Sequence, residues 1–589
     1  MTPPRFLAVI GSDPSRVSRR RVVEAAVRLG LRTVFQGDDL IVLAGRDTPA
    51  IVMPGERGVV VGTVFERSAD PESAYHKATT ITVPEPFDEG LLRTYWGSFV
   101  AFTVDKLRRT ARVCRDPSGS TDCYRSRKGD IDFVYSDVAI AHALGLIEGR
   151  PDPAALAHHL AYAGLRVEQT ALAGVLEVLP GTMVGLDGVG PVSRRCAWTP
   201  WTFAERGNQI SDRQAAADLV RLETLRCVSA WAGEFSSILH ELSGGLDSSI
   251  VAACLGSDVH TLRCINVVTP DPGADERAYA QQVAGHIGAP LTTVILDAAD
   301  SSLDGLAEVI NPRPGSGMLH QVLDRAVTRE VERTGAQACF SGGGGDNVFS
   351  YLHTAAPATD AFRCHGLGPV FWQSISDLAA MHACTTWRAG SLALRKACRP
   401  LKSWPRTTDF LRRGAAASSP AIHPWLEAPP GALQGRQEHI FSLMSAQNPV
   451  SSQASHGPAR IFYPLLSQPL VELCLRIPSW MWISGGRNRA VARDAFAGQL
   501  PRAILQRRTK GDFTGFLGDL YEMHRSALGD LLLDGWLAAQ GLLDREAIEA
   551  YLTSAAPVTD YRFDRLMGLA NAEVWTRSWL ARPAATSLP

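Results

Sequence analysis

The sequence predicts an α/β protein with a β-rich amino-terminal part, residues 1–205, and a carboxyl-terminal part, residues 206–589, built on a parallel sheet. In the first part, short apolar runs alternate with turn residues, as in antiparallel sheets. In the second, strand-like and helix-like segments alternate, which favours a parallel sheet with helices on its faces. Two glycine-rich runs each follow a predicted strand there, and ligands of parallel sheets bind at such positions.

The amino-acid composition excludes several classes of protein. The chain has 589 residues, of which 45% are hydrophobic and 20% charged, and its net charge is −1. This predicts a soluble protein with no affinity for nucleic acid or anionic membrane. No apolar run reaches the ~18 residues of a membrane span, and the start lacks a secretion signal, so we expect a cytoplasmic location. The 11 cysteines form no Cys-x-x-Cys pair, which argues against a zinc site or a disulfide scaffold.

The expected elements of the amino-terminal part are strands at 59–65 and 99–104, a turn within 112–124, a helix at 152–164 and a turn entering a strand at 179–183. A polar linker is expected at 201–213. The carboxyl-terminal part then alternates between predicted strands at 236–242, 262–268, 291–296 and 336–340 and predicted helices at 214–232, 248–255, 276–287 and 321–334. The remainder, 350–589, reads as mostly helical and is expected to shape a substrate cleft.

The first glycine-rich run carries the strongest functional signal. It reads Ser243-Gly244-Gly245-Leu246-Asp247-Ser248-Ser249 and lies between a predicted strand and a predicted helix. Glycines let backbone N–H groups approach an anion, and the helix directs its positive end to the same place. Such a loop suits a polyphosphate, although a plain glycine turn at a helix start is the simpler alternative. It is not a Walker A loop, because Gly-x-x-x-x-Gly-Lys is absent.

The second run, Ser341-Gly342-Gly343-Gly344-Gly345-Asp346-Asn347, follows the strand predicted at 336–340. Alone it would indicate only a flexible loop. Because both runs end in an aspartate at the carboxyl ends of strands, we expect Asp247 and Asp346 to bind one Mg²⁺ between them.

These motifs resemble a known family. Ser-Gly-Gly-Leu-Asp-Ser is similar to the pyrophosphate loop of ATP pyrophosphatases and to the synthetase domain of class B asparagine synthetases. Later segments agree in order, although Ser467 replaces an aspartate of the family; they are Tyr463-Pro464-Leu465-Leu466, Arg489 with Arg493, Leu500-Pro501 and Arg508-Thr509-Lys510-Gly511. The resemblance covers most of the chain and implies a parallel-sheet ATP-pyrophosphatase domain.

The resemblance implies ATP as cosubstrate, Mg²⁺ as cofactor and an acyl-adenylate that an amine attacks. It implies Lys510 as the catalytic cation, although without it a surface lysine would be the better interpretation. Arg489 and Arg493 would contact pyrophosphate, or form a solvated helix face. Leu242 and Val267 would flank the adenine or ribose, and Ser341 and Gly342 would contact the nucleotide.

The amino-terminal part resembles the Ntn-hydrolase glutaminase domain of the same family through Gly97 to Phe102 and Arg115 to Gly119. That α/β sandwich uses a cysteine directly after the initiator methionine as its nucleophile. This chain begins Met1-Thr2-Pro3-Pro4, and its first cysteine is Cys114. We therefore expect an inactive glutaminase-like domain that serves as a scaffold, and an amine that does not come from glutamine.

Among relatives without a working glutaminase, lasso-peptide macrolactam synthetases resemble the chain best. β-Lactam synthetases carry a tyrosine, and an ammonia-dependent asparagine synthetase would carry a glutamate, where this chain has Gly343. The resemblance implies isopeptide closure in a ribosomal precursor peptide, with a leader peptidase and a leader-recognition protein as partners. Small-molecule amide, β-lactam or asparagine synthesis and a non-catalytic nucleotide-binding scaffold stay open as alternatives. Apolar walls for a peptide are expected from Trp372, Trp387, Trp404 and Trp425, or these tryptophans belong to the core.

Overall fold

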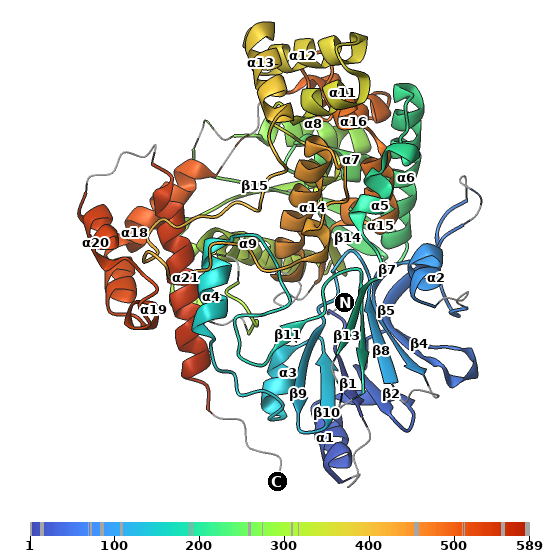
Figure 1. The fold of residues 1–589 in the computed structure, drawn as a ribbon, viewed down its shortest axis with the longest axis vertical. Helices are drawn as coiled ribbons and strands as arrows, with labels where there is room; N and C mark the ends of the chain where they lie inside the picture. Colours follow the sequence, from blue (N-terminus) through green and yellow to red (C-terminus); the bar gives the residue numbers. More distant parts are fainter. Residues whose placement is uncertain are drawn as a thin grey trace.

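The computed structural model of the chain (Figure 1) describes residues 3–11, 17–68, 70, 73–82, 87–105, 110–187, 190, 192–256, 261–271, 273, 275–307, 310–315, 317–452, 459–508, 511, 513–554 and 560–583. Its amino-terminal part contains two antiparallel sheets, and its carboxyl-terminal part contains one parallel sheet surrounded by helices. The mixed α/β fold class predicted from the sequence is confirmed.

One amino-terminal sheet has the strand order β11-β9-β10-β1-β3-β2. Its strands are β1 (Phe6–Ile10), β2 (Leu31–Gln36), β3 (Leu40–Gly45), β9 (Tyr124–Lys128), β10 (Ile131–Tyr135) and β11 (Leu176–Glu177). The second sheet has the order β13-β12-β8-β7-β5-β4, and β6 pairs with β5. Its strands are β4 (Ala50–Val52), β5 (Gly58–Glu66), β6 (His76–Lys77), β7 (Tyr95–Asp105), β8 (Thr110–Arg115), β12 (Thr182–Leu186) and β13 (Ser193–Cys196).

The two sheets pack face to face through alternate side chains of their strands. Phe6 of β1 and Phe102 of β7 meet edge to face, with ring centroids 5.5 Å apart. Residues of both sheets, including Val42 and Val113, are fully buried in the same apolar cluster. Because side chains alternate along a strand, this inner layer leaves the other faces for helices. The helices of this part are α1 (Val17–Arg28), α2 (Phe87–Thr94), α3 (Val138–Ala143), α4 (Pro153–Ala161) and α5 (Pro200–Ala204).

The third sheet is parallel, with the strand order β16-β15-β14-β17-β18. Its strands are β14 (Ser237–Glu241), β15 (Thr261–Val268), β16 (Leu291–Ile295), β17 (Ala338–Ser341) and β18 (Ile461–Phe462). The connecting helices are α6 (Arg213–Ala232), α7 (Leu246–Leu255), α8 (Arg277–Ile287), α9 (Met318–Thr334) and α10 (Gly345–Val348). The strand β18 and the short helix α10 were not predicted. The bounds of the other elements differ from the predicted ones by at most three residues, because a strand followed by a helix has a strong local signature.

The rest of the chain is helical, as predicted. A group of three helices projects from the top of the view in Figure 1: α11 (Ala356–His365), α12 (Pro369–Met381) and α13 (Thr386–Ala397). The remaining helices are α14 (Gln434–Ser452), α15 (Gln468–Arg476), α16 (Ala490–Ala495), α17 (Arg502–Gln506), α18 (Thr514–Leu533), α19 (Trp536–Ala539), α20 (Arg545–Thr553) and α21 (Arg562–Leu580). The boundary expected at 205/206 falls between α5 and α6.

Charged groups buried between the two parts connect them. Glu177 of the amino-terminal part accepts hydrogen bonds from Arg115 at 2.7 Å and Arg166 at 2.6 Å, and it also pairs with Arg313 of the other part. These arginines hold the pKa of Glu177 at about 2, against the opposing effect of burial. Glu472 of α15 likewise accepts from the indole of Trp198 at 2.7 Å. Paired and buried charges of this kind fix how two units sit together.

Seven of the 11 cysteines are buried, and none forms a disulfide within the part of the chain that the structure describes. Buried free cysteines behave as small apolar residues. Among the described helices, none combines the length and apolarity that a membrane span requires.

Candidate active site

The two glycine-rich runs leave neighbouring strands of the parallel sheet and pack against each other. β14 and β17 pair in parallel, so Glu241 at the end of one strand lies opposite Ser341 at the end of the other. A side chain on Gly342 would lie 2.4 Å from the backbone nitrogen of Ser248, and one on Gly345 would lie 2.5 Å from the Cβ of Asp247. Gly342 and Gly345 of the second run are therefore required for contact with the first, which is a more specific role than loop flexibility.

The imidazole of His240 contacts the strand before the second run and the helix turn after the first run. Its imidazole is fully buried, and its two ring nitrogens lie 3.0 Å from the carbonyl oxygen of Phe340 and 2.8 Å from that of Ser248. Burial lowers the pKa of this histidine to about 4, so it is neutral at physiological pH. The ring thus connects β14 to β17 and to the first turn of α7.

Arg489 lies between the two aspartates that the sequence predicts as metal ligands. Its Nη1 donates to Asp247 Oδ2 at 2.8 Å and to Asp346 Oδ1 at 2.5 Å. Its guanidinium also stacks 4.7 Å above the ring of Tyr351. The residue has φ +48°, a left-handed conformation that costs a non-glycine residue energy and is found most often at functional sites.

The two carboxylates meet the requirements of a Mg²⁺ site. Oxygen atoms of Asp247 and Asp346 both lie within hydrogen-bond distance of the single atom Nη1 of Arg489, so one small cation could contact both. Magnesium is usually held by one or two carboxylates together with substrate phosphates. The described residues contain no cluster of three or more His, Cys, Asp or Glu side chains that could hold a metal ion. In the structure, Arg489 supplies the positive charge at this point.

A cleft of about 490 Å³ opens beside the glycine-rich runs. Twelve of the fourteen predicted cofactor-binding and metal-binding residues line it: Leu242, Ser243, Gly245, Leu246, Asp247, Ser248, Val267, Ser341, Gly342, Asp346, Arg489 and Arg493. Arg493 donates to the carbonyl oxygen of Leu505 at 2.8 Å, and burial lowers its pKa to about 10.

Two predicted nucleotide-binding residues do not line the cleft. Gly244 packs against α8, where an added Cβ would lie 2.6 Å from the backbone nitrogen of Ala280. Ser249 is fully buried, and its hydroxyl donates back to the carbonyl oxygen of Gly245 at 2.7 Å. Both residues shape the loop instead of facing a ligand. Lys510, the predicted catalytic residue, lies outside the described residues.

Acidic residues on one wall of the cleft were missed by the sequence analysis. Glu241 and Asp324 both line the cleft, beside His320 and Tyr463. Burial and the nearby Glu241 raise the pKa of Asp324 to about 7. Burial also raises the pKa of Glu241, although a hydrogen bond from Ser341 opposes this effect. Glu241 could have been noticed because it precedes the first run directly, but Asp324 lies within α9, and only the fold brings it here.

Tyr463 explains why glycine stands at position 343. An added Cβ on Gly343 would lie 2.8 Å from the ring of Tyr463. The phenol therefore occupies space that a larger side chain at 343 would need. Glycine at 343 thus leaves room for an aromatic ring from another segment of the chain.

The four tryptophans expected to form apolar walls are not among the residues that line the cleft. Trp404 and Trp425 are buried in the core, as the alternative interpretation stated. Trp372 of α12 and Trp387 of α13 are exposed on the projecting helices. Tryptophan alone cannot distinguish a core from a cleft position, since it is suited to both.

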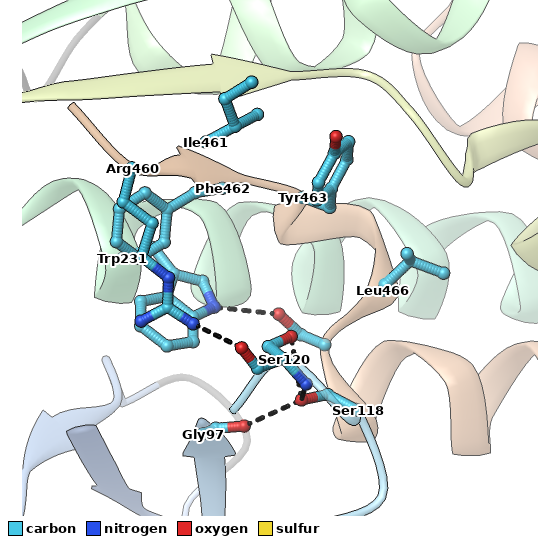
Figure 2. Close-up of a pocket in the computed structure, with 10 residues that line it drawn as sticks. Gly97, Ser118, Ser120, Trp231, Arg460, Ile461, Phe462, Tyr463 and Leu466 are labelled. Carbon is cyan, nitrogen blue, oxygen red and sulfur yellow. Dashed lines mark hydrogen bonds between the residues drawn. The ribbon is translucent and has the colours of Figure 1, made fainter. Parts of the chain in front are cut away.

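Figure 2 shows the contact between the amino-terminal part and the cleft region, around a void of only about 20 Å³. Arg460 enters this contact and donates to the hydroxyl of Ser98 and to the carbonyl oxygen of Ser120, both at 2.8 Å. Its guanidinium also lies 5.0 Å above the ring of Phe462. Burial lowers the pKa of Arg460 to about 10, so it keeps its charge at neutral pH. Tyr463 and Leu466 line both this void and the cleft.

The carboxyl-terminal part of the chain matches a known protein family. The family model for asparagine synthase matches residues 235–577. A search of curated proteins found no match. The solved structures that resemble the chain include one described as the allosteric regulatory enzyme of purine biosynthesis, at 9% identity and TM-score 0.22, covering 49% of this chain and 80% of that one. Another is the glutamine phosphoribosylpyrophosphate amidotransferase from B. subtilis, at 10% identity and TM-score 0.18, covering 49% and 65%.

The family match spans the parallel sheet, both glycine-rich runs and the arginines of α16, which together form the cleft. The chain therefore belongs to the asparagine synthase family, whose members use ATP, and is an adenylate-forming carbon–nitrogen ligase.

Proposed function

We propose that this ligase closes a macrolactam in a ribosomal peptide. An Asp or Glu side chain of the peptide is adenylated, and the peptide's own amino-terminal amine then attacks it. The observation that carries this proposal is the closed contact at Arg460 between the amino-terminal part and the cleft. It favours an amine that enters with the substrate over ammonia delivered from within the protein.

The size and chemistry of this contact support that reasoning. The void at Arg460 is about 20 Å³, which is close to the space of a single water molecule. Two hydrogen bonds hold the side chain of Arg460 in this contact. Opening the contact would break these bonds to a buried charge, which costs free energy. The cleft, at about 490 Å³, is far larger. Among the described residues, the cleft is thus the more accessible route for an amine.

The first half of the proposed reaction takes place at the glycine-rich runs. A carboxylate oxygen of the peptide attacks the α-phosphorus of ATP, and the bond to the bridging oxygen breaks as pyrophosphate leaves. Backbone N–H groups around Gly245 and the start of α7 are placed to bind phosphate oxygens. Arg489 and Arg493 supply positive charge beside them. Mg²⁺ held by Asp247 and Asp346 would neutralise charge on the phosphates.

The second half requires an amine without its extra proton. The amine nitrogen attacks the acyl carbon, AMP leaves, and the nitrogen gives up a proton. Asp324 is suited to accept that proton, because its pKa of about 7 leaves it largely ionised just above neutral pH. Tyr463 lies on the same wall and also lines the void toward the amino-terminal part. We therefore assign the amine to the wall formed by Glu241, Asp324 and Tyr463.

The proposed partners follow from the substrate. A ribosomal precursor peptide must lose its leader before its new amino terminus can react, so a leader peptidase and a leader-recognition protein would act with this enzyme. The amino-terminal part would serve as a scaffold that supports the cleft through Glu177 and Arg460.

The test uses leaderless candidate peptides encoded near the gene, incubated with the enzyme, ATP and Mg²⁺. Intact-mass spectrometry should show loss of one water from a peptide, with an equal amount of AMP formed. The same peptide with an acetylated amino terminus is the matched control, because it can be adenylated but cannot cyclise. Adding hydroxylamine should then trap its activated carboxylate as a hydroxamate.

Other results separate the alternatives. AMP formation with no change in any peptide mass would reject the macrolactam proposal and indicate a small-molecule acid. ATP binding without AMP formation or pyrophosphate exchange, from folded enzyme supplied with peptide and candidate partner proteins, would indicate a nucleotide-binding scaffold.

A further inference from the structure

A second hollow, of about 370 Å³, lies on the group of helices that projects from the molecule. It is formed by the segment before α11, the end of α12 and the start of α13, all at the top of Figure 1. We call it the α12–α13 groove. Its lining includes His353, Leu378, His382, Cys384, Arg388 and Leu392.

The α12–α13 groove is joined to the nucleotide cleft by two aromatic contacts. Tyr351 lines the cleft, and Arg489 stacks on its ring. The ring of Tyr351 meets the imidazole of His353 edge to face, with centroids 4.1 Å apart. His353 lines the groove. A substrate peptide that extends from the reaction centre past Arg489 would therefore reach the groove once it has passed the side chain of Tyr351.

The lining combines an apolar base with polar and cationic groups. Leu378 and Ala389 are buried, whereas the side chain of Leu392 is 45% exposed. Arg388 is exposed at the rim, with the imidazoles of His353 and His382 nearby. Ligand-binding pockets typically combine apolar contact area with a few polar groups in this way.

The surrounding segment, residues 351–406, is basic, in contrast to the chain as a whole with its net charge of −1. It contains seven lysines and arginines and two aspartates. Both aspartates are buried: Asp360 accepts a hydrogen bond from the backbone of Gly435, and Asp377 accepts one from that of Gly485. Glu438 of α14, which reaches the groove through Thr354, is neutralised by Lys396 at 2.5 Å. The charge of this surface therefore suits an anionic partner.

Two non-glycine residues with left-handed backbone conformations lie in the loops beside the groove. Ser350 has φ +51° and Ala383 has φ +48°, and both lack the freedom of glycine. Strained non-glycine residues persist where the surrounding structure enforces them, and they gather at ligand-binding sites. Next to the groove, Trp387 is 85% exposed and offers a large apolar surface.

We propose that the α12–α13 groove binds an acidic, apolar segment of the substrate peptide, which lies outside the two residues that become joined. This inference rests on the proposed function, because it takes the substrate to be a peptide. Apolar side chains of the segment would lie on Leu378 and Leu392, and its carboxylates would face Arg388.

The experiment measures binding without turnover. A fluorescein-labelled synthetic peptide rich in Leu and Glu is titrated with the full chain, and fluorescence anisotropy is followed. A peptide of equal length rich in Leu and Lys is the comparison ligand. We expect Arg388→Glu and Leu392→Glu each to weaken binding of the acidic peptide by about tenfold. Both positions are exposed, so the variants should unfold at the same temperature as the parent chain.

Arg363→Glu is the matched control, because it makes the same charge reversal at an exposed position of α11 that does not line the groove. It should change the affinity by less than about twofold. If Arg363→Glu and Arg388→Glu weaken binding of the acidic peptide equally and Leu392→Glu has no effect, the groove proposal is overturned. The binding would then reflect only general charge attraction between the protein and the peptide. Failure to bind the acidic peptide, with binding to phosphatidylserine vesicles, would overturn it in favour of a membrane surface.

The measurement separates this inference from the proposed function. If the acidic peptide binds and the variants change its affinity as expected, but no peptide is ever cyclised, the groove proposal stands and the macrolactam proposal fails. If peptides are cyclised and Arg388→Glu leaves their KM unchanged, the macrolactam proposal stands and the groove fails.

Discussion

The guanidinium of Arg489 donates to Asp247 at 2.8 Å, so an arginine stands where the sequence predicts a metal ion. The same nitrogen also donates to Asp346. A shared cation of either kind relieves the repulsion between two carboxylates held by neighbouring loops. We expect Arg489 to move toward the phosphates when a nucleotide and Mg²⁺ bind, because the ion then supplies the charge between the aspartates.

Replacing either aspartate should abolish turnover and leave the fold intact. In Asp247→Ala or Asp346→Ala, Arg489 keeps the other carboxylate as its partner, so no buried charge is left alone. Loss of a metal ligand should reduce AMP formation by at least about a hundredfold. The measurements are AMP release and the thermal unfolding midpoint. Asp218→Ala, an exposed change on α6, is the control. Near-normal activity in either variant would refute the shared-metal site.

Asp324→Asn should alter the dependence of turnover on pH. As a proton acceptor, Asp324 works only when ionised, so the rate in the parent enzyme should rise as pH passes about 7 and fall below it. The variant should be slow at all pH values and lack this transition. Asp519→Asn, at an exposed position on α18, is the control and should keep the parent profile. An unchanged profile in Asp324→Asn would remove Asp324 from the reaction.

The same raised pKa makes a prediction about stability. The folded protein keeps the proton on Asp324 up to about pH 7, whereas the unfolded chain loses it near 3.8. The contribution of this group to stability is therefore greatest at low pH and declines between these two values. Asp324→Asn cannot ionise, so its unfolding midpoint relative to the parent should rise from pH 4 to pH 7 and then stay level. A constant difference across this range would contradict the raised pKa.

Gly343→Ala tests the contact with Tyr463. The added methyl group would press on the phenol ring, and overpacking of this kind costs about 1–3 kcal/mol. Tyr463→Ala removes the obstacle, so the two changes together should cost less than the sum of the single changes. A double-mutant cycle of urea unfolding midpoints measures this coupling. Strict additivity would show that Tyr463 does not fill the space beside Gly343.

Arg460→Met should weaken the connection between the two parts of the chain. Methionine fills much of the same volume but loses the hydrogen bonds to Ser98 and Ser120, at a cost of about 1–3 kcal/mol. The unfolding midpoint should fall, whereas Arg32→Met on the exposed edge of β2 should leave it unchanged.

Glutamine should not support AMP formation in the parent enzyme. Amide formation that depends on glutamine would show that the contact at Arg460 does not block nitrogen transfer.

Lys510→Ala should lose turnover while keeping ATP binding, because a cation that stabilises the transition state contributes little to ground-state affinity. The two readouts are AMP formation and nucleotide binding by calorimetry. Arg502→Ala, an exposed change on α17, is the control. Full activity of Lys510→Ala would show that Lys510 is a surface lysine without a catalytic role.

The sequence by itself determined the fold class, most element bounds and twelve of the residues around the nucleotide cleft. It could do so because strand periodicity, helix periodicity and glycine-rich turns are local patterns, encoded within a few consecutive residues. Asp247 and Asp346, in the segments that follow β14 and β17, could be paired from the rule that parallel strands end at one edge.

Only the tertiary structure decided which distant side chains meet. Arg489 reaches Asp247 across 242 positions of the chain, and Arg460 reaches Ser98 across 362. Tyr463 fills the space beside Gly343, Asp324 faces the cleft from within a helix, and Trp404 belongs to the core instead of a substrate wall. No local pattern encodes such contacts, because they depend on how separate elements pack, and packing is decided by the shapes of all the surrounding side chains at once.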